Sequence, residues 1–336
     1  MKKRKSFLTR LALALNLFLL LLQLMTMDVL SLGLEIPILS LGVPLLCLIN
    51  FIFFVFWTLR LKWPAFLFLI VFAWSFESWQ LLYQFKSKGI ITSKGLHVMS
   101  YNVRSFNRFN WLDVEDVPMS IANFVKTTAP DVVCFQEYAK DNAPLFKEYP
   151  YQVFLPYVSN GRIGSCIISK YPILNSKKIT FKASQNGGMQ SDLIWKKDTL
   201  RLYNIHFESL RIDSKDTLFS PEYSKKFNTK IKRVFELQKK QVAQFETLAS
   251  TNRFPEILCT DLNNNSFSKS YKTLASARVD AFKQKGKGFG ATHQFSFFPF
   301  RIDYILAAPN FKIIDFKTHD IVLSDHKPIS ALLSWR

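Results

Sequence analysis

Six short polar segments recur between residue 100 and the C-terminus, each at or just beyond the end of a run with strand character. Their side chains are carboxylates, carboxamides and imidazoles, which are the groups that metal-assisted attack on a phosphate ester requires. A hard cation takes oxygen ligands, and a phosphoryl group in transfer needs fixed donors around it. The pattern therefore predicts phosphoester hydrolysis. The six segments are 100–102, 135–137, 204–206, 261–263, 301–303 and 323–329.

In their order and context these segments resemble the endonuclease/exonuclease/phosphatase superfamily, whose members include DNase I, apurinic endonucleases, inositol polyphosphate 5-phosphatases and neutral sphingomyelinases. The resemblance covers residues 96–336. One Asn-x-His or Asp-His segment occurs by chance in many chains, whereas six in the expected order do not. The resemblance implies an α/β fold, a four-layered α/β sandwich in which two packed mixed β-sheets are flanked by helices.

The resemblance also implies a metal site formed by Asn102, Glu137 and Asp325. Glu137 follows an apolar strand and resembles the family's principal metal-binding glutamate. Asn102 matches the asparagine beside the metal and phosphate, and Asp325 resembles a further metal-site carboxylate. Taken singly, a glutamate after a strand is usually a solvated surface residue, and an asparagine there is ordinary turn chemistry. Because the set supplies oxygen ligands and no cysteine, Mg²⁺ or Mn²⁺ is the expected ion.

His206 and His326 are two of five histidines in the chain, and both lie in family-like segments. His206 resembles the histidine of the Asn-x-His strand end that contacts the scissile phosphate. His326 resembles the histidine that stabilises the pentacovalent transition state or helps to activate water. Asp303 is its expected orienting partner, because a buried carboxylate fixes the imidazole tautomer and raises its basicity. Outside such segments a lone histidine beside apolar neighbours is more often structural.

Asp261 and Asn263 are expected to share one side of an extended segment, because positions i and i+2 of a strand face the same way. The carboxylate can then accept a proton from the attacking water or orient it, while the carboxamide donates to a phosphate oxygen. Family members commonly have glycine before this aspartate. Thr260 stands there in this chain, which leaves the local backbone geometry open.

Short apolar runs separated by turn signals predict many strands in the second part of the chain, with helical spacing in two places. This succession suits a two-sheet α/β sandwich flanked by helices. The expected helices are 119–127 and 226–248. The expected strands are 96–101, 131–136, 151–155, 164–169, 192–195, 200–205, 256–259, 302–306 and 330–335.

The first 85 residues differ sharply from the rest. Apolar runs at 11–27, 36–59 and 63–83 predict three transmembrane helices, since about 20 apolar residues cross a bilayer. Glu77 lies inside the third run, which makes that span the weakest of the three. A cleaved signal peptide would explain only the first run, and a soluble core does not require three in succession.

Basic residues set the expected orientation in the bilayer. Five of them precede the first span, Arg60 and Lys62 lie in the second loop, and Asp28 and Glu35 lie in the first loop. Under the positive-inside rule the N-terminus and the second loop are cytoplasmic. With three spans, the large C-terminal part is then extracytoplasmic, and the protein is a multi-pass membrane protein.

The sequence therefore predicts three parts. These are a membrane anchor at 1–85, a polar linker at 86–95 and a catalytic domain at 96–336. The cysteines of the domain each sit in an apolar run without Cys-x-x-Cys spacing, so buried free thiols are expected.

The formal net charge of the chain is +19, and most of this excess lies beyond residue 85. A domain this basic is expected to attract polyanions, either nucleic acid or an anionic membrane surface. The charge peaks along the expected helix 226–248, and the segment 104–111 mixes arginines with aromatic rings. Such a mixture suits both base stacking and insertion into a lipid interface.

The leading hypothesis is a membrane-anchored, divalent-metal-dependent phosphodiesterase or nuclease. A phosphatase or phosphodiesterase acting on lipids or small molecules at the bilayer is the alternative within enzymes. A catalytically silent adaptor that binds a phosphorylated partner is a third possibility from another class. The expected partners are a phosphoester substrate and the lipid bilayer, with no obligate protein partner evident. Family members share the chemistry and differ in loops, so the substrate stays open.

Overall fold

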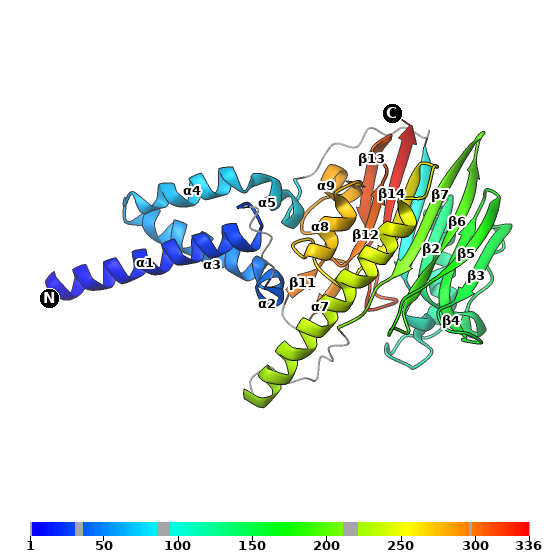
Figure 1. Ribbon diagram of the computed structural model, residues 1–336, viewed down its shortest axis with the longest axis horizontal. Helices are drawn as coiled ribbons and strands as arrows, with labels where there is room; N and C mark the ends of the chain where they lie inside the picture. The colour runs from blue at the N-terminus through cyan, green and yellow to red at the C-terminus, as the bar shows by residue number, and fades with distance from the viewer. Residues whose placement is uncertain (1, 31–35, 86–94, 211–220, 296–297, 336) are drawn as a thin grey trace. The chain divides into compact units, whose positions relative to one another are not determined.

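The structure is a computed structural model that describes residues 2–30, 36–85, 95–210, 221–295 and 298–335. The chain forms two compact units, whose elements are labelled in Figure 1. The first unit contains Met1–Tyr83 and Ser266–Lys269, and the second contains Gln84–Asn265 and Ser270–Arg336. Most of the predicted linker, 86–94, lies outside the described residues.

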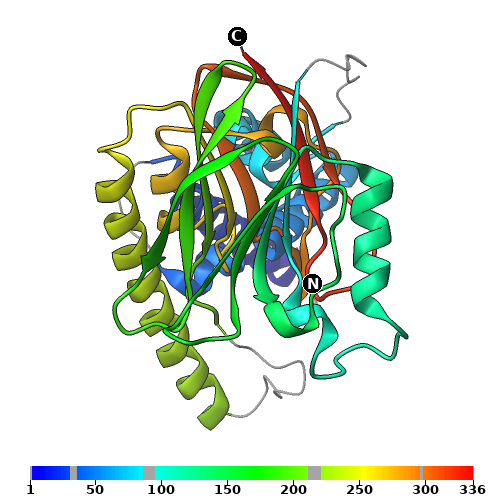
Figure 2. The ribbon, with the colours of Figure 1, turned by 90° about the vertical axis from the view of Figure 1, so that its right-hand side faces the viewer.

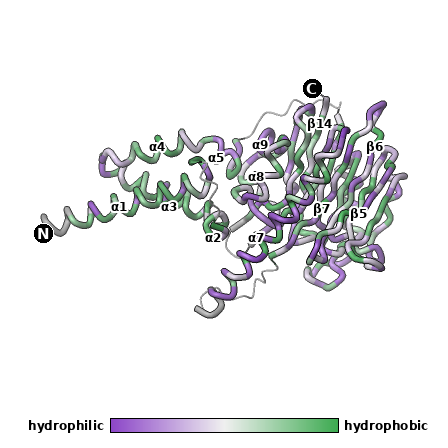
Figure 3. The backbone as a smooth tube through the Cα atoms, viewed as in Figure 1, coloured by the Kyte–Doolittle hydropathy of each residue, from purple (hydrophilic) through white to green (hydrophobic). Residues whose placement is uncertain are grey.

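The described secondary structure of the first unit consists of helices joined by short turns. Its helices are α1 (Lys2–Thr26), α2 (Pro37–Leu41), α3 (Val43–Leu59), α4 (Pro64–Trp74) and α5 (Phe76–Leu82). Figure 3 shows that hydrophobic residues dominate α1, α3 and α4. A proline occupies one of the first two positions of α2, α3 and α4, where its missing N–H costs no helical hydrogen bond.

The expected spans correspond to helices of unequal length. Within α1, the 20 residues Phe7–Thr26 are long and apolar enough to cross a membrane. The second run is divided at Gly42 into α2 and the 17-residue α3. The third run is broken at Ser75, so that α4 and α5 make an angle of 77° and together count as at most one span.

Buried polar side chains link α1 to α3. Trp57 Nε1 donates to Asn16 Oδ1 at 3.1 Å, and Asn50 Nδ2 donates to Gln23 Oε1 at 2.8 Å. All four side chains are buried among apolar neighbours. Hydrogen bonds of this kind join helices where water is excluded.

The second unit contains two six-stranded mixed sheets. The strand order of the first sheet is β13-β14-β1-β2-β4-β3, and that of the second is β5-β6-β7-β8-β12-β9. Within these sheets β1 pairs with β2 and β7 with β8 in parallel, while the other pairs are antiparallel. The strands are β1 (Leu96–Asn102), β2 (Val132–Ala139), β3 (Tyr151–Pro156), β4 (Ile163–Ser169), β5 (Ile173–Thr180), β6 (Gly187–Trp195), β7 (Asp198–His206), β8 (Glu256–Asp261), β9 (Val279–Asp280), β12 (Asp303–Ala307), β13 (Phe311–Thr318) and β14 (Ile329–Trp335).

Two longer helices and several short ones accompany the sheets. Figure 2 shows α6 (Val117–Thr128) and α7 (Pro221–Ala249) on opposite outer sides of the pair of sheets. The short helices are α8 (Lys269–Ala275) and α9 (Ala281–Lys285), with 3-10 turns at η1 (Arg104–Asn107) and η2 (Lys140–Asn142). A small hairpin joins β10 (His293–Phe295) to β11 (Phe298–Phe300). The prediction of two packed mixed sheets flanked by helices is therefore confirmed.

The main core lies between the two sheets. Alternate residues of the central strands are fully buried there, among them Val98, Cys134, Leu202, Cys259 and Ile305. This spacing follows from the two-residue period of a strand. A second cluster packs the outer face of the first sheet against α6. The cysteines of the domain are buried free thiols in these cores.

Sequence analysis missed several strands at or near the sheet edges. β5 and β13 each carry two lysines, and β13 has an irregular register between Ile313 and Asp315. Charges and irregularities are typical of edge strands and obscure the alternating pattern. β6 also begins earlier than predicted, at Gly187. A side chain at Gly188 would place its Cβ 2.5 Å from Asn204 O, so only glycine fits this close pairing.

Candidate active site

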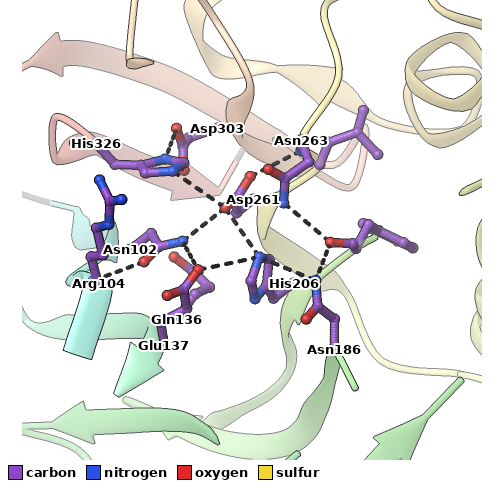
Figure 4. A network of polar contacts seen from close by, with 12 residues as sticks. Asn102, Arg104, Gln136, Glu137, Asn186, His206, Asp261, Asn263, Asp303 and His326 are labelled. Carbon is purple, nitrogen blue, oxygen red and sulfur yellow. Dashed lines mark hydrogen bonds and ion pairs between the residues drawn. The ribbon is translucent and has the colours of Figure 1, made fainter. Parts of the chain in front are cut away.

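The ends of the central strands bring the predicted residues together. Asn102 is the register partner of Gln136 at the ends of the parallel strands β1 and β2. His206 and Asp261 are partners at the ends of β7 and β8, and Asp303 at the start of β12 also pairs with Asp261. Figure 4 shows the resulting cluster of side chains.

Asp261 lies at the centre of this cluster and is fully buried. Its Oδ2 accepts a hydrogen bond of 2.8 Å from Asn102 Nδ2 and lies 3.4 Å from His206 Nε2 and 3.7 Å from His326 Nε2. Burial raises the pKa of Asp261 to about 6, although the neighbouring imidazoles act in the opposite direction. The carboxylate is therefore more basic than an exposed aspartate.

His326 and Asp303 form a buried pair. His326 Nδ1 lies 3.0 Å from Asp303 Oδ2 and 3.2 Å from Oδ1. Burial alone would lower the pKa of His326, but the carboxylates of Asp303 and Asp261 outweigh it and raise that pKa well above the usual value. The imidazole is thus held as a cation whose Nε2 faces Asp261. This geometry agrees with the predicted orienting contact.

Glu137 is placed by an irregularity in β2. The pairing of β2 with β4 shifts register between Phe135 and Tyr138, and Glu137 adopts a left-handed φ of 49°. Such a bulge re-aims a side chain at the end of a strand. The Glu137 backbone N–H donates to Tyr157 Oη at 3.0 Å, and its Oε1 accepts from Asn102 Nδ2 at 3.2 Å. Burial raises the pKa of the carboxyl, with the Asn102 contact opposing it.

His206 is buried beside three polar side chains. Its Nε2 lies 3.4 Å from Asp261 Oδ2, 3.6 Å from Glu137 Oε1 and 3.4 Å from Asn186 Nδ2. Burial lowers the pKa of this imidazole, despite the attraction of Asp261. Unlike His326, His206 is therefore held in the neutral form.

Asn263 follows Asp261 in a sharp turn. It has a left-handed φ of 54°, and its backbone N–H donates to Asp261 Oδ1 at 2.9 Å. Its Nδ2 donates to Phe207 O at 3.1 Å, so one donor of the carboxamide is already engaged by the backbone. Thr260 is a regular, fully buried residue of β8, paired with Tyr304. The departure from glycine at this position thus leaves the strand undisturbed.

Asp325 has different neighbours from the other predicted metal residues. Its Oδ2 accepts from Arg104 Nη1 at 2.5 Å and lies 3.6 Å from His293 Nε2. Burial would raise the pKa of this carboxyl, but His293, His326 and Arg104 outweigh it and hold the pKa well below the usual range. Asp325 is therefore ionised and in contact with cationic or donor groups.

Several residues support this cluster in a role that the sequence did not indicate. Buried Gln136 donates to Asn204 Oδ1 at 2.8 Å, and Asn204 Nδ2 donates to Phe135 O at 2.9 Å. These bonds join the two sheets directly beneath the site. Asn186 Nδ2 donates to Phe207 O at 2.8 Å, which fixes the chain after β7. Gln136 and Asn204 lie within the polar segments 135–137 and 204–206, but their supporting role was not predicted, because their partners are distant in sequence.

Gln238 of α7 is a further missed residue, and it is fully buried. Its Nε2 donates to Glu208 O at 2.7 Å, Leu262 O at 3.1 Å and Asn263 O at 3.3 Å. Its Oε1 accepts from Asn264 Nδ2 at 2.7 Å. The side chain therefore joins the loop after His206 to the loop after Asp261. A glutamine on the apolar stripe of an amphipathic helix is a signal that could have identified it.

The donor set suits a hard divalent cation. Among the described residues, two groups have their ligand atoms within 4.8 Å of one another: His293, Asp325 and His326, and Asp261, Asp303 and His326. Glu137 belongs to neither group, but its carboxylate lies at the same strand ends. Its side chain is 32% exposed, and partial burial raises its pKa, so a cation beside it would stabilise the charged form. These groups combine carboxylate oxygens with imidazole nitrogens and contain no thiolate, so they could hold a divalent cation.

Comparison with solved structures places the second unit among proteins of known fold. Humanised D. rerio TDP2 with 14 mutations superimposes with a TM-score of 0.57 and 17% identity, covering 71% of this chain and 98% of that one. The human Nocturnin catalytic domain with a bound sulfate anion gives 0.54 and 16%, covering 72% and 95%. A mannosyl-6-phosphatase of Bacteroides thetaiotaomicron gives 0.50 and 17%, covering 71% and 100%. At these identities the likeness establishes the fold alone.

Comparison of sequences gives two further results. Among curated proteins, no sequence matches the chain. The sequence profile of the Endonuclease/Exonuclease/phosphatase family matches residues 99–326, from the middle of β1 to His326. This range includes every predicted metal and catalytic residue. The chain therefore belongs to the Endonuclease/Exonuclease/phosphatase family.

Proposed function

We propose that this protein is a membrane-anchored, divalent-metal-dependent phosphoesterase whose leading substrates are phosphodiesters, nucleic acid first among them. The observation that carries the proposal is the placement of buried Asp261 between neutral His206 and the cationic His326–Asp303 pair. The Asp261 carboxylate can accept a proton, and the His326 imidazolium can donate a hydrogen bond to the negative charge that develops on the phosphate oxygens.

The residues have distinct roles in this proposal. Asp261 accepts a proton from the attacking water, since its pKa of about 6 lies closer to neutrality than that of an ordinary aspartate. The water oxygen bonds to phosphorus, and the bond from phosphorus to the leaving oxygen breaks. His326 donates to a phosphoryl oxygen through Nε2, while Asp303 holds Nδ1. Asn102 orients Asp261 through its 2.8 Å hydrogen bond.

Asn102, Glu137 and Asp325 are the residues proposed to hold Mg²⁺ or Mn²⁺. When bound, the cation neutralises charge on the phosphate and lowers the pKa of coordinated water. His206 and Asn263 are proposed to contact the nonbridging phosphate oxygens. His206 Nε2 faces Asp261 and Glu137, and Asn263 keeps part of its carboxamide free of the 3.1 Å bond to Phe207 O.

The substrate assignment rests on charge. The chain carries a net charge of +19, and α7 exposes Lys225, Lys226, Lys232 and Arg233. Such a surface attracts a phosphate backbone. The alternative is a lipid or small-molecule phosphoester at the bilayer, which the apolar first unit favours.

A panel of plasmid DNA, RNA, phospholipids, sphingomyelin and sugar phosphates, each with Mg²⁺, Mn²⁺ or chelator, tests both substrate classes. Hydrolysis that persists in chelator would exclude the metal-dependent reaction.

The proposed membrane anchor is the first unit. Large apolar side chains are exposed on its helices, such as Phe18 (60%), Ile52 (57%) and Phe66 (66%). Exposed apolar surface on this scale requires a nonaqueous environment or a partner. The basic residues in the first part of α1 and those after α3 support a cytoplasmic N-terminus and an extracytoplasmic catalytic domain. A reporter that is active only outside the cytoplasm, fused after Gly95, should give signal. Signal from a cytoplasm-only reporter would mean that one apolar run does not span.

A further inference from the structure

We propose that Arg104 forms a separate anion subsite at the rim of the candidate centre. In this subsite Arg104 binds a second negatively charged oxygen, in addition to the one that every phosphodiester carries. The inference rests on the proposed phosphoesterase function and narrows its substrate class. The substrate would carry a second negative charge close to the scissile bond, either on the same phosphate or on a neighbouring one.

Arg104 is only partly used by the protein. Its Nη1 donates to Asp325 Oδ2 at 2.5 Å. Its backbone N–H donates to Asn102 Oδ1 at 2.9 Å, which Figure 4 shows. No other group among the described residues bonds its Nε or Nη2. The side chain is 33% exposed, so these donors are accessible. A guanidinium presents its donors as a planar fork that matches phosphate oxygens.

Trp111 and Asp325 hold this guanidinium in place. The Arg104 Cζ lies 4.0 Å from the centroid of the Trp111 ring, and Phe109 contacts the same indole at 5.7 Å between centroids. Trp111 covers one face of the guanidinium, and Asp325 accepts a hydrogen bond from Nη1. Among the described residues, no group bonds the edge formed by Nε and Nη2. Because the side chain is already ordered, an incoming anion meets a smaller entropic cost.

The backbone of the segment also favours a functional role for Arg104. Residues 104–107 all have left-handed φ values, which are 38°, 56°, 54° and 58°. Such conformations are unfavourable for residues other than glycine and persist only where the surroundings enforce them. Phe106 is fully buried in the core beside α6, and Asn142 Nδ2 donates to Phe106 O at 2.9 Å. The surrounding core thus stabilises the unfavourable backbone conformation of residues 104–107, and this turn places Arg104 next to Asp325.

Asp325 engages only one of the side-chain donors of Arg104. Its single Oδ2 atom serves both Arg104 and His293, whose Nε2 lies 3.6 Å away. An oxyanion beside Asp325 could therefore take up the free donors of Arg104. A phosphomonoester offers such an oxygen on the scissile phosphate, and a nucleic acid or a phosphorylated headgroup offers it on an adjacent phosphate.

Selectivity ratios measured on the full chain in detergent with Mg²⁺ or Mn²⁺ test the proposal. The first ratio compares 4-nitrophenyl phosphate with bis(4-nitrophenyl) phosphate, and the second compares a 5′-phosphorylated dinucleotide with its unphosphorylated form. Arg104→Met should lower at least one ratio of kcat/KM about tenfold, the effect of one charge-assisted hydrogen bond. A fall in the first ratio identifies the scissile phosphate as the source of the charge, and a fall in the second identifies the neighbour.

Two matched variants and a binding measurement complete the test. Arg108→Met removes an exposed arginine from the same segment and should keep both ratios. Arg104→Lys keeps the charge but loses the planar fork of donors, so it should restore part of the selectivity.

Equal losses of kcat/KM in Arg104→Met on all four substrates would overturn the subsite, because Arg104 would then act only through Asp325. If the wild type hydrolyses none of them, the proposed function fails, and titration with inorganic phosphate in chelator decides the subsite. Equal affinities of wild type and Arg104→Met would then overturn it.

Discussion

His206 and Asp261 are register partners at the ends of the parallel strands β7 and β8, with Nε2 and Oδ2 3.4 Å apart. They are 55 positions apart in sequence, yet the sheet makes them neighbours. Parallel strands that start in register also end at the same edge, so two polar strand ends must meet. The antiparallel strand β12 adds Asp303 to the same point, because its first residue pairs with Asp261.

The first prediction concerns Glu137. Glu137→Gln should lower turnover by several orders of magnitude and weaken Mn²⁺ binding, because a neutral amide replaces the proposed metal-binding carboxylate. The melting temperature without metal should not fall, since burial already disfavours the charged form of this carboxyl. Isothermal titration with Mn²⁺ and thermal unfolding in chelator measure the two effects.

Glu115→Gln is the matched control, because it makes the same chemical change at an exposed position. It should leave turnover and Mn²⁺ affinity as in the wild type. Unchanged Mn²⁺ affinity in Glu137→Gln would show that the cation is held by other residues, such as the group of Asp261, Asp303 and His326.

The second prediction concerns Gln238. Gln238→Met removes the donor that serves three backbone carbonyls and the acceptor for Asn264. Leaving buried polar groups unpaired costs about 1–3 kcal/mol for each. We expect a lower melting temperature and, at temperatures where the variant is fully folded, a kcat about 10 to 100 times lower. The loss of kcat follows from displacement of Asp261 and His206.

Gln244→Met provides the comparison on the same helix. Gln244 is exposed and makes a single bond of 2.8 Å to Thr180 O. It should retain kcat and lose little stability. If Gln238→Met is destabilised but has the wild-type kcat, Gln238 supports only the fold and does not position the site.

The side chains of the site could be identified from the sequence because most of them lie next to the end or the start of a short strand. The positions of Asn102, His206, Asp261 and Asp303 relative to one another follow from strand pairing alone. Their strands contain short apolar stretches bounded by polar residues, which makes the strand ends visible. The metal and catalytic roles of these residues remain predictions, which the variants above address.

Other features could not be predicted, because they depend on contacts between distant segments. Nothing near Arg104 indicates a bond to Asp325, which lies 221 positions further along the chain. The orientation of Glu137 depends on the pairing of β2 with β4. The bend at Ser75 between α4 and α5 likewise interrupts an apolar run that reads as continuous.

The third prediction concerns the pH dependence of stability. His319 is buried, its Nε2 lies 2.8 Å from Ser330 Oγ, and Phe124 packs against its ring. Burial lowers the pKa of His319 to about 4, and the charges of Lys317 and His97 act in the same direction. The unfolded chain binds this proton near pH 6.5, so the folded state is favoured fully above that pH. The stabilisation, roughly 3 kcal/mol, is lost as the pH falls from about 6.5 to 4.

His319→Gln should flatten this dependence, because glutamine has no proton to bind in the unfolded chain. Relative to the wild type, the melting temperature of the variant should rise progressively as the pH falls from 7.5 to 4. Parallel curves across that range would mean that His319 does not contribute to acid destabilisation.

The last prediction separates a nuclease from a lipid enzyme by means of α7. We define its basic face as Lys225, Lys226, Lys232 and Arg233, which are all exposed. If these residues contact a nucleic acid backbone, replacing all four with glutamine should weaken binding to every sequence alike. The slope of log affinity against log salt should fall by roughly 3 to 4, since each phosphate contact releases about 0.9 counterion from duplex DNA.

A control variant makes the same charge change in and next to the second sheet. It replaces four exposed lysines, which are Lys177 in β5, Lys182 just after β5, and Lys196 and Lys197 between β6 and β7. It should lower affinity only slightly and keep most of the salt slope, because general attraction is reduced without loss of specific contacts. If the basic face instead binds the bilayer, its neutralisation should spare hydrolysis of a short soluble substrate and reduce activity on anionic vesicles. DNA cleavage that is indifferent to both the basic face and the salt concentration would exclude this surface as a nucleic-acid contact and favour a lipid-linked or small phosphoester as substrate.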